Sequence, residues 1–276
     1  MADMSKLVPL GLSGPLSMTA GGGSVWIADA ASKSAVRYDP ASARVTAKIN
    51  LESAPLDITW AGGVVACALE RGDIAAYEAV SGRLLWRGAT AAGSLRLSGG
   101  PDCLWAWEPG SAKAWSFDLS GGVVRYQLWP IAALAAVSNA AYFLGADGRL
   151  GYQEAGQPLS HAEPQKARAS SWGAVVACAN ALWVSAASSL ILIDRRTLAI
   201  RATLAAPEGA VPHLVCDEGR LMGGLHSAFL FDPAADAKVR PLGVHSKSSW
   251  RAIAAASSCL WLLETGEASV QILEVP

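Results

Sequence analysis

The sequence predicts an all-β fold: a seven-bladed β-propeller with four-stranded blades, in which an N-terminal strand closes the last blade. The first observation is a repeat, because an apolar anchor, usually Trp after Val or Leu, recurs every 37 to 41 residues along the 276-residue chain. The second is the pattern within each repeat, where short apolar strands alternate with turns rich in Gly, Asn and Asp. Periods near 40 residues with several strands per unit are typical of propellers.

The anchors mark the second strand of each repeat. We assign them to Trp26, Val65, Trp105, Tyr142, Trp183, Leu221 and Trp261. A residue that recurs in every repeat is expected to pack in the core. Because seven repeats take up nearly the whole chain, we expect residues 1–276 to form a single domain.

The other strands follow in a fixed order around each anchor. An inner strand comes first and begins with a small residue or proline before a larger one. These starts are Pro15-Leu16, Pro55-Leu56, Ser94-Leu95, Ala133-Leu134, Ser171-Trp172, Pro212-His213 and Ser249-Trp250. After the anchor, a third strand ends near an acid, as in Ile193-Asp194-Arg195, and a fourth closes the unit, as in residues 123–128.

The last repeat supplies only three strands before Pro276. The segment Lys6–Leu12 precedes the first inner strand and fits no other repeat. We therefore predict that it is the outer strand of the final blade, which leaves no blade open at either end of the chain.

Composition limits the classes of partner. Hydrophobic residues make up 52% of the chain, charged residues 16%, and the formal net charge is −1. No basic run exists, so neither nucleic acid nor an anionic membrane surface is expected as a partner. Met1–Leu10 shows no signal-peptide pattern, which favours a cytoplasmic protein. The uncharged stretch Ala169–Ile193 is long enough to span a bilayer, but its repeat pattern indicates buried strands.

The five cysteines are Cys67, Cys103, Cys178, Cys216 and Cys259. None has the spacing of a metal site, and each lies in an apolar, strand-like run. We therefore expect buried free thiols that behave as small hydrophobes, consistent with a reducing cytoplasm.

The inner-strand starts should gather at one mouth of the central channel, where a ligand could bind. Two candidate rings of residues result. The first is Leu16, Leu56, Leu95, Leu134, Trp172, His213 and Trp250; the second is Ser17, Asp57, Arg96, Ala135, Gly173, Leu214 and Arg251. Strand side chains alternate, so only one ring can face the channel at a given depth, and the sequence leaves open which.

Within these rings, six residues are candidates for substrate binding or catalysis. His213 could act as a base or metal ligand near neutral pH. Trp172 and Trp250 could form aromatic walls beside it or simply pack between blades. Arg96 and Arg251 could hold a carboxylate or phosphate through two hydrogen bonds, or an arginine could form a self-neutralising pair with Asp57.

Three acids share an offset of three residues after an anchor: Asp29, Glu108 and Glu264. Carboxylate oxygens are the ligands that Mg²⁺ and Ca²⁺ prefer, so these acids are candidate metal ligands. They also begin short loops, where solvated acids are ordinary.

The repeat resembles that of the streptogramin (virginiamycin B) lyase family. The matching sequence segments are Pro15-Leu-Ser-Met18 with Val25-Trp-Ile-Ala-Asp29, then Leu104-Trp-Ala-Trp-Glu108 and Cys259-Leu-Trp-Leu-Leu-Glu264. The resemblance implies a propeller and a magnesium-dependent lyase that opens a cyclic depsipeptide, using Pro-His pairs and a Glu after an anchor. Pro212-His213 and Glu264 match that set, whereas Trp250-Arg251 stands where a second His would be.

Two functions follow as hypotheses. The first is binding of a small organic or anionic ligand at one channel mouth. Lyase-type catalysis would then use His213 as base, Arg251 to hold an anionic group and Glu264 to bind Mg²⁺ or orient His213. The second is a non-catalytic scaffold for protein–protein interaction, in which a plugged channel and an exposed apolar outer patch are expected.

Overall fold

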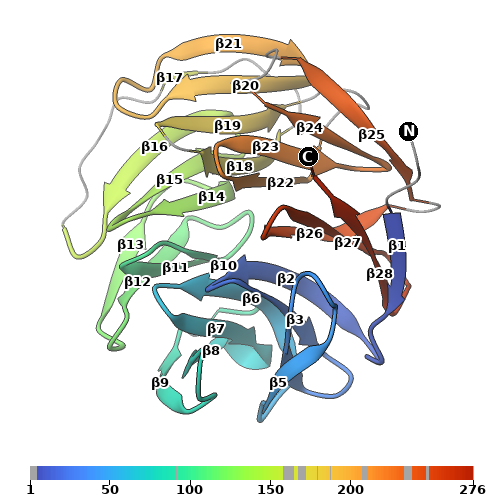
Figure 1. The fold of residues 1–276 in the computed structure, drawn as a ribbon. Helices are drawn as coiled ribbons and strands as arrows, with labels where there is room; N and C mark the ends of the chain where they lie inside the picture. The colour runs from blue at the N-terminus through green and yellow to red at the C-terminus, as the bar shows by residue number, and fades with distance from the viewer. Residues whose placement is uncertain are drawn as a thin grey trace.

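A computed structural model of the chain describes residues 5–90, 92–157, 165–166, 172–178, 180–186, 188–206, 211–232, 238–246 and 249–275, with the backbone alone for Ser5, Gln165, Lys166 and Trp172. Its strands form seven four-stranded sheets arranged in a ring (Figure 1). All strand pairs in these sheets that the structure describes are antiparallel, so the predicted all-β, seven-bladed propeller is confirmed.

Each blade contains an inner, an anchor, a third and an outer strand, in that order from the centre. Blades 1 to 4 are β2 (Pro15–Gly21), β3 (Ser24–Asp29), β4 (Ser34–Tyr38), β5 (Val45–Asn50); β6 (Pro55–Ala61), β7 (Val64–Leu69), β8 (Asp73–Glu78), β9 (Leu84–Ala89); β10 (Arg96–Gly99), β11 (Cys103–Trp107), β12 (Lys113–Asp118), β13 (Val123–Gln127); and β14 (Ile131–Val137), β15 (Ala140–Gly145), β16 (Arg149–Glu154), β17 (Gln165–Lys166). Blades 5 to 7 are β18 (Trp172–Cys178), β19 (Ala181–Ala186), β20 (Ser189–Asp194), β21 (Ile200–Ala205); β22 (His213–Asp217), β23 (Arg220–Gly224), β24 (Ser227–Phe231), β25 (Val239–His245); and β26 (Trp250–Ala256), β27 (Cys259–Glu264), β28 (Ser269–Glu274), β1 (Ser5–Pro9). A short 3₁₀ turn, Glu70–Gly72, follows β7.

The ring closes as predicted. Strand β1 pairs with β28 in the register Ser5↔Leu273 to Pro9↔Ser269, and Figure 1 shows the two strands side by side. The amide of Leu10 extends the pairing by donating to the carbonyl of Ala268 at 3.0 Å. The first strand of the chain thus completes the last blade.

The core lies between the blades. Seven clusters of buried apolar side chains, counted over the described residues, each join one blade to the next. Anchor strands such as β7 are buried at every position, because a blade packs against a neighbour on both of its faces. Trp26, Trp105 and Trp261 are at most 1% exposed, so the predicted core role of the Trp anchors is confirmed.

Two anchors are corrected. The Trp and Tyr anchors are the third residue of their strands, and by that register blade 2 has Ala66 and blade 6 has Met222, not Val65 and Leu221. Ala66 and Met222 pack against the following blade, as Trp26 does, whereas Val65 packs against the preceding one. Strands buried on both faces lack an alternating pattern, so the sequence offered no signal for the register.

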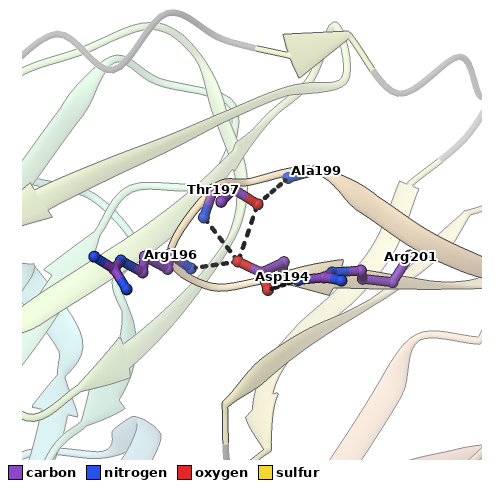
Figure 2. Close-up of polar contacts among 5 residues, drawn as sticks. All are labelled: Asp194, Arg196, Thr197, Ala199 and Arg201. Carbon is purple, nitrogen blue, oxygen red and sulfur yellow. Dashed lines mark hydrogen bonds and ion pairs between the residues drawn. The ribbon is translucent and has the colours of Figure 1, made fainter.

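The turn between the third and outer strands is held by an acid. In blade 5, Asp194 accepts hydrogen bonds from the backbone amides of Arg196 at 3.0 Å and Thr197 at 2.8 Å, and pairs with Arg201 at 2.6 Å (Figure 2). The Thr197 hydroxyl also donates to Asp194, at 3.0 Å. The Thr197 amide, Arg201 and the Thr197 hydroxyl together hold the pKa of the Asp194 carboxyl well below its usual value.

One cysteine prediction is wrong. Cys178 and Cys216 form a disulfide between β18 and β22, with their Cα atoms 5.4 Å apart. The two residues stand 38 positions apart, almost one repeat, and the sequence alone did not show that these neighbouring strands bring them together. Cys67, Cys103 and Cys259 are buried free thiols, as predicted.

The uncharged stretch 169–193 contains β18, β19 and most of β20, so its prediction as strands is confirmed where it is described. Among the described residues, no helix has the length and apolar character needed to cross a bilayer.

Candidate ligand site at the channel mouth

The strand register identifies one ring of residues at the channel mouth. In each blade, the ring residue is the inner-strand residue that pairs with the fifth residue of the anchor strand. This mouth ring consists of Ser17, Asp57, Arg96, Ala133, Ala174, His213 and Ala252, in blades 1 to 7. In blade 5 the ring position is marked by the amide of Ala174, which donates to the hydroxyl of Ser185 at 2.7 Å.

The mouth ring corrects the two rings drawn from the sequence. His213 shares its ring with Asp57 and Arg96, whereas the sequence had placed it in the other one. For Asp57 the reason is a β-bulge, because bulges add residues to β2, β6, β14, β18 and β26 but not to β22. Strand β10 also has no bulge, and Arg96 is its first residue, as His213 is the first of β22. Arg251 lies in one such bulge, between Trp250 and Ala252, and is therefore outside the ring.

Asp57 links three blades. Its Oδ1 accepts hydrogen bonds from the Ser17 hydroxyl at 2.6 Å and the Ile58 amide at 3.0 Å, and its Oδ2 accepts one from the Leu97 amide at 2.9 Å. The side chain is 7% exposed. Burial raises the pKa of the Asp57 carboxyl, and the positive charge of Arg96 and the hydrogen bonds offset only part of that shift.

Arg96, the next residue round the ring, is exposed. No ion pair within 4.0 Å joins it to any residue that the structure describes, so the self-neutralising pair with Asp57 does not form. Its positive charge nevertheless acts to lower the pKa of Asp57, in the neighbouring blade, and that of His213, three blades away. Small residues, Ala133 and Ala174, occupy the intervening ring positions.

His213 is half-buried on β22. Burial lowers the pKa of its imidazole to about 4, and a hydrogen bond with the backbone of Trp250 and the nearby Arg96 charge act in opposite directions on this value. The ring is therefore neutral at pH 7, with polar nitrogens but no charge.

The three predicted catalytic residues meet around Trp250. His213 bonds to the backbone of Trp250, Arg251 follows Trp250 in the chain, and Glu264 is the strand partner of Trp250. The Glu264 carboxylate accepts a hydrogen bond from the Ser246 hydroxyl at 2.5 Å. His213, Arg251 and Glu264 thus each adjoin the backbone of Trp250 at the junction of blades 6 and 7, and their catalytic roles stay predictions.

The two tryptophans differ in what the structure describes. Trp250 is 2% exposed and packs in the cluster between blades 6 and 7. A Cβ added to Gly224 would lie 3.0 Å from its ring, so the glycine makes room for the indole. We therefore leave Trp250 out of the proposed site. The side chain of Trp172 lies outside the described part of the structure, and its role stays a prediction.

The predicted metal ligands lie in three different blades. Asp29 accepts hydrogen bonds from the amides of Ser13 and Gly14 and from the Ser32 hydroxyl. Burial opposes the ionisation of Asp29, but these bonds together lower the pKa of its carboxyl. Glu108 accepts one from the Gly93 amide at 3.2 Å and pairs with Lys113 at 3.6 Å.

Asp29 and Glu108 each tie the end of an anchor strand to the segment that precedes the inner strand of the same blade, whereas Glu264 of blade 7 is bonded to Ser246, which follows β25 of blade 6. Among the described residues, no group of three or more His, Cys, Asp or Glu could hold one metal ion. The three acids therefore do not form a common ligand set, and binding of Mg²⁺ stays a prediction on which no step below depends.

A cavity of about 410 Å³ runs along the inner strands of all seven blades. Ser17 and Asp57 of the mouth ring line it, as do Trp60 and Cys216 deeper along the strands. Two participants were missed from the sequence: the Ser17 hydroxyl, which bonds Asp57, and Cys216, which is part of the disulfide. The only signal for either residue in the sequence was its position one repeat from its partner: 40 residues between Ser17 and Asp57, and 38 between Cys178 and Cys216.

The comparisons with known proteins show the fold. No protein-family model matches the chain, and no curated protein matches it. Among solved structures, the chain is similar to one described as "Crystal Structure of Mitotic Checkpoint Complex", with a TM-score of 0.80 and 13% sequence identity over 98% of this chain and 95% of that one. Membership of the streptogramin lyase family stays a prediction.

Proposed function

We infer that the protein binds a small organic anion at the channel mouth, with Arg96 as the group that holds the anion. The observation that carries this proposal is the exposed Arg96 guanidinium, which has no ion pair among the described residues and stands on the same ring as His213. An arginine can grip a carboxylate or phosphate through two parallel hydrogen bonds.

Charge at the mouth supports an anion rather than a cation. Asp57 is bonded to Ser17, Ile58 and Leu97, and burial raises the pKa of its carboxyl, which weakens its competition for Arg96. His213 adds nitrogen atoms that can donate or accept a hydrogen bond without adding charge at neutral pH.

The size of the channel fits a small molecule. The cavity that Ser17 and Asp57 line has a volume of about 410 Å³, within the range of roughly 300 to 1,000 Å³ found for ligand pockets. Arg96 and His213 share the strand level of Asp57 but are not among the lining residues of the cavity. Three of the other mouth-ring positions hold alanine, Ala133, Ala174 and Ala252, which add no charge or polar side chain to the ring.

Lyase catalysis is the weaker part of the earlier hypothesis. A general base works best when its pKa lies near the working pH, and a His213 pKa of about 4 makes a weak base at pH 7. We therefore propose binding without assigning a reaction. The cytoplasm stays the predicted compartment.

Titration calorimetry with phthalate and with inorganic phosphate tests the proposal. We expect phthalate to bind the wild-type protein, its neutral diamide not to bind, and Arg96→Gln to weaken phthalate at least about tenfold, since a charged hydrogen-bonded pair is lost. Arg125→Gln, an exposed arginine on the outer strand of the same blade, is the matched control and should bind as the wild type does. No binding of either anion, or equal binding by Arg96→Gln, contradicts the proposal.

A second candidate is a protein partner on the outer rim. Four outer strands begin with an exposed apolar residue, between 41 and 56% accessible: Val45, Leu84, Val123 and Ile200. The structural relative is part of a protein complex, which favours this candidate only by analogy of fold. A photoreactive residue at Leu84, in the protein's own cells, should give one dominant protein adduct, and none at exposed Glu218. Adducts at both positions, or at neither, would remove this candidate.

A further inference from the structure

The disulfide Cys178–Cys216 is a covalent link between neighbouring blades. It joins inner strand β18 of blade 5 to inner strand β22 of blade 6 and closes a loop with a sequence separation of 38. A 276-residue chain with an apolar core between neighbouring blades does not need a covalent cross-link in order to fold. The position of the link therefore calls for a functional account.

The two cysteines differ in exposure. Both pack in the apolar cluster between blades 5 and 6, but Cys178 is only 5% exposed, whereas Cys216 is half-buried and lines the channel cavity. A small molecule that enters the channel reaches Cys216 first. Cys178 then stands on the far side of the bond, where a leaving thiolate would depart.

The other cysteines do not compete for such chemistry. Cys67, Cys103 and Cys259 are buried in the core between other blades. Burial raises the pKa of the Cys67 thiol to about 12 and that of Cys103 to about 11, and it raises that of Cys259 as well. A thiol reacts as its thiolate, so these three remain inert at neutral pH.

We propose that Cys178–Cys216 is a redox-active disulfide that exchanges with small thiols entering the channel. The thiolate of one small thiol attacks Sγ of Cys216, the S–S bond breaks, and Cys178 leaves as a thiolate that takes up a proton. A second small thiol attacks the mixed disulfide on Cys216. It releases the oxidised disulfide of the small thiol and leaves Cys216 reduced, so two small thiols are oxidised for each link opened.

Opening the link acts on the strand that carries His213. His213 and Cys216 both lie on β22, three residues apart, so reduction removes the covalent tie between that strand and blade 5. The proposal rests on the cysteines alone and does not depend on anion binding at Arg96. Each can fail without the other.

Thiol counting establishes the starting state. Unfolded protein that has not been reduced should show three reactive thiols, and reduced protein should show five. Five thiols before reduction, in protein kept in air, would overturn the proposal because no disulfide would exist.

The rate of reduction by 2-mercaptoethanol, followed by alkylation and mass spectrometry, tests exchange in the folded protein. We expect the rate to rise in proportion to thiol concentration and to change less than about twofold in about 1 M urea, since native exchange exposes no new surface. A rise of roughly 100-fold in that urea would mean that reduction requires unfolding. The disulfide would then be a structural staple, and the proposal would be overturned.

Two variants make the result specific. The double variant Cys178→Ala with Cys216→Ala should show no change in melting temperature on reduction, while the wild type should fall by roughly 5–10 °C as the closed loop is released. Cys259→Ala, which loses a buried free thiol, is the control and should keep the response. An unchanged wild-type melting temperature after complete reduction would contradict the link between blades 5 and 6.

Discussion

The outer turns and the mouth ring use polar residues in different ways. In the outer turns, the same acid-centred arrangement returns from blade to blade: Asp39, Asp118 and Asp194 each accept a backbone amide at 2.8 Å from a residue two or three positions later. In the mouth ring, by contrast, Asp57, Arg96 and His213 each occur in one blade, and alanine occupies three of the other positions. A polar residue that the repeat preserves holds the fold, and one that departs from the repeat is a candidate for function.

Asp57 gives the largest expected effect on stability and is the sharpest exception to this rule. It departs from the repeat, yet its carboxylate accepts three hydrogen bonds that join blades 1, 2 and 3. Asp57→Ala leaves the Ser17 hydroxyl and the Leu97 and Ile58 amides without their acceptor. We expect it to lower the free energy of unfolding by about 2–4 kcal/mol in urea titrations.

Asp57→Asn separates the hydrogen bonds from the charge. The amide keeps one oxygen acceptor and removes the cost of burying a carboxylate, so its loss should be clearly smaller than that of Asp57→Ala. If Asp57→Ala were as stable as the wild type, the three bonds would not hold the blades together and Asp57 would join the functional residues.

His213 gives an effect of intermediate size, which depends on pH. Its pKa of about 4 in the folded state lies below the value of 6.5 for an unperturbed histidine, so between these values the unfolded chain binds a proton that the folded chain does not. Folding stability therefore falls as the pH drops from 6.5 towards 4. Between pH 7 and 4.5 we expect His213 to account for a loss of about 2 kcal/mol.

The measurement is the difference in unfolding free energy between pH 7 and 4.5 for the wild type and for His213→Gln. The variant should lose less stability over this interval, because glutamine takes up no proton. An equal loss in both proteins would show that His213 is not held neutral at the mouth.

The outer turn of blade 5 gives the smallest effect. Thr197→Ala removes the hydroxyl that donates to Asp194 and accepts the Ala199 amide at 3.3 Å, in an exposed turn (Figure 2). Since surface contacts contribute little, we expect the melting temperature to fall by at most about 2 °C, with Thr197→Ser unchanged. A fall larger than that of Asp57→Ala would reverse the ranking of the two regions.

The fold could be predicted because the same pattern of strands and turns occurs in seven repeats along the sequence. The period, the Trp anchors and the unpaired third strand of the last repeat were enough to predict the blades and their closure through β1. Residues without a repeated signal were harder. Ala66 and Met222 are not aromatic, and the β-bulge in β6 that brings Asp57 level with His213 has no signal in the residue types.

The candidate site was predicted in its members but not in its arrangement. His213, Arg96 and Asp57 were found because they differ from the repeat, and Trp250 was found for the same reason although it packs in the core. The Cys178–Cys216 link could not be predicted, since pairing depends on the distance between neighbouring blades and not on spacing within one repeat. A residue that departs from the repeat is a candidate for function. Its burial and hydrogen bonds then show whether it holds the fold, as Trp250 does, or stays available for a ligand, as Arg96 does.

Proton NMR of the His213 imidazole tests most directly whether Arg96 and His213 form one anion site. The signal is assigned by its loss in His213→Gln, and its pKa is measured with and without saturating phthalate. We predict a pKa near 4 in the free protein that rises when phthalate binds the wild type, because a neighbouring anion stabilises the imidazolium, and that does not rise in Arg96→Gln. A His213 pKa that is unaffected by bound phthalate, or that rises equally in Arg96→Gln, would contradict the site.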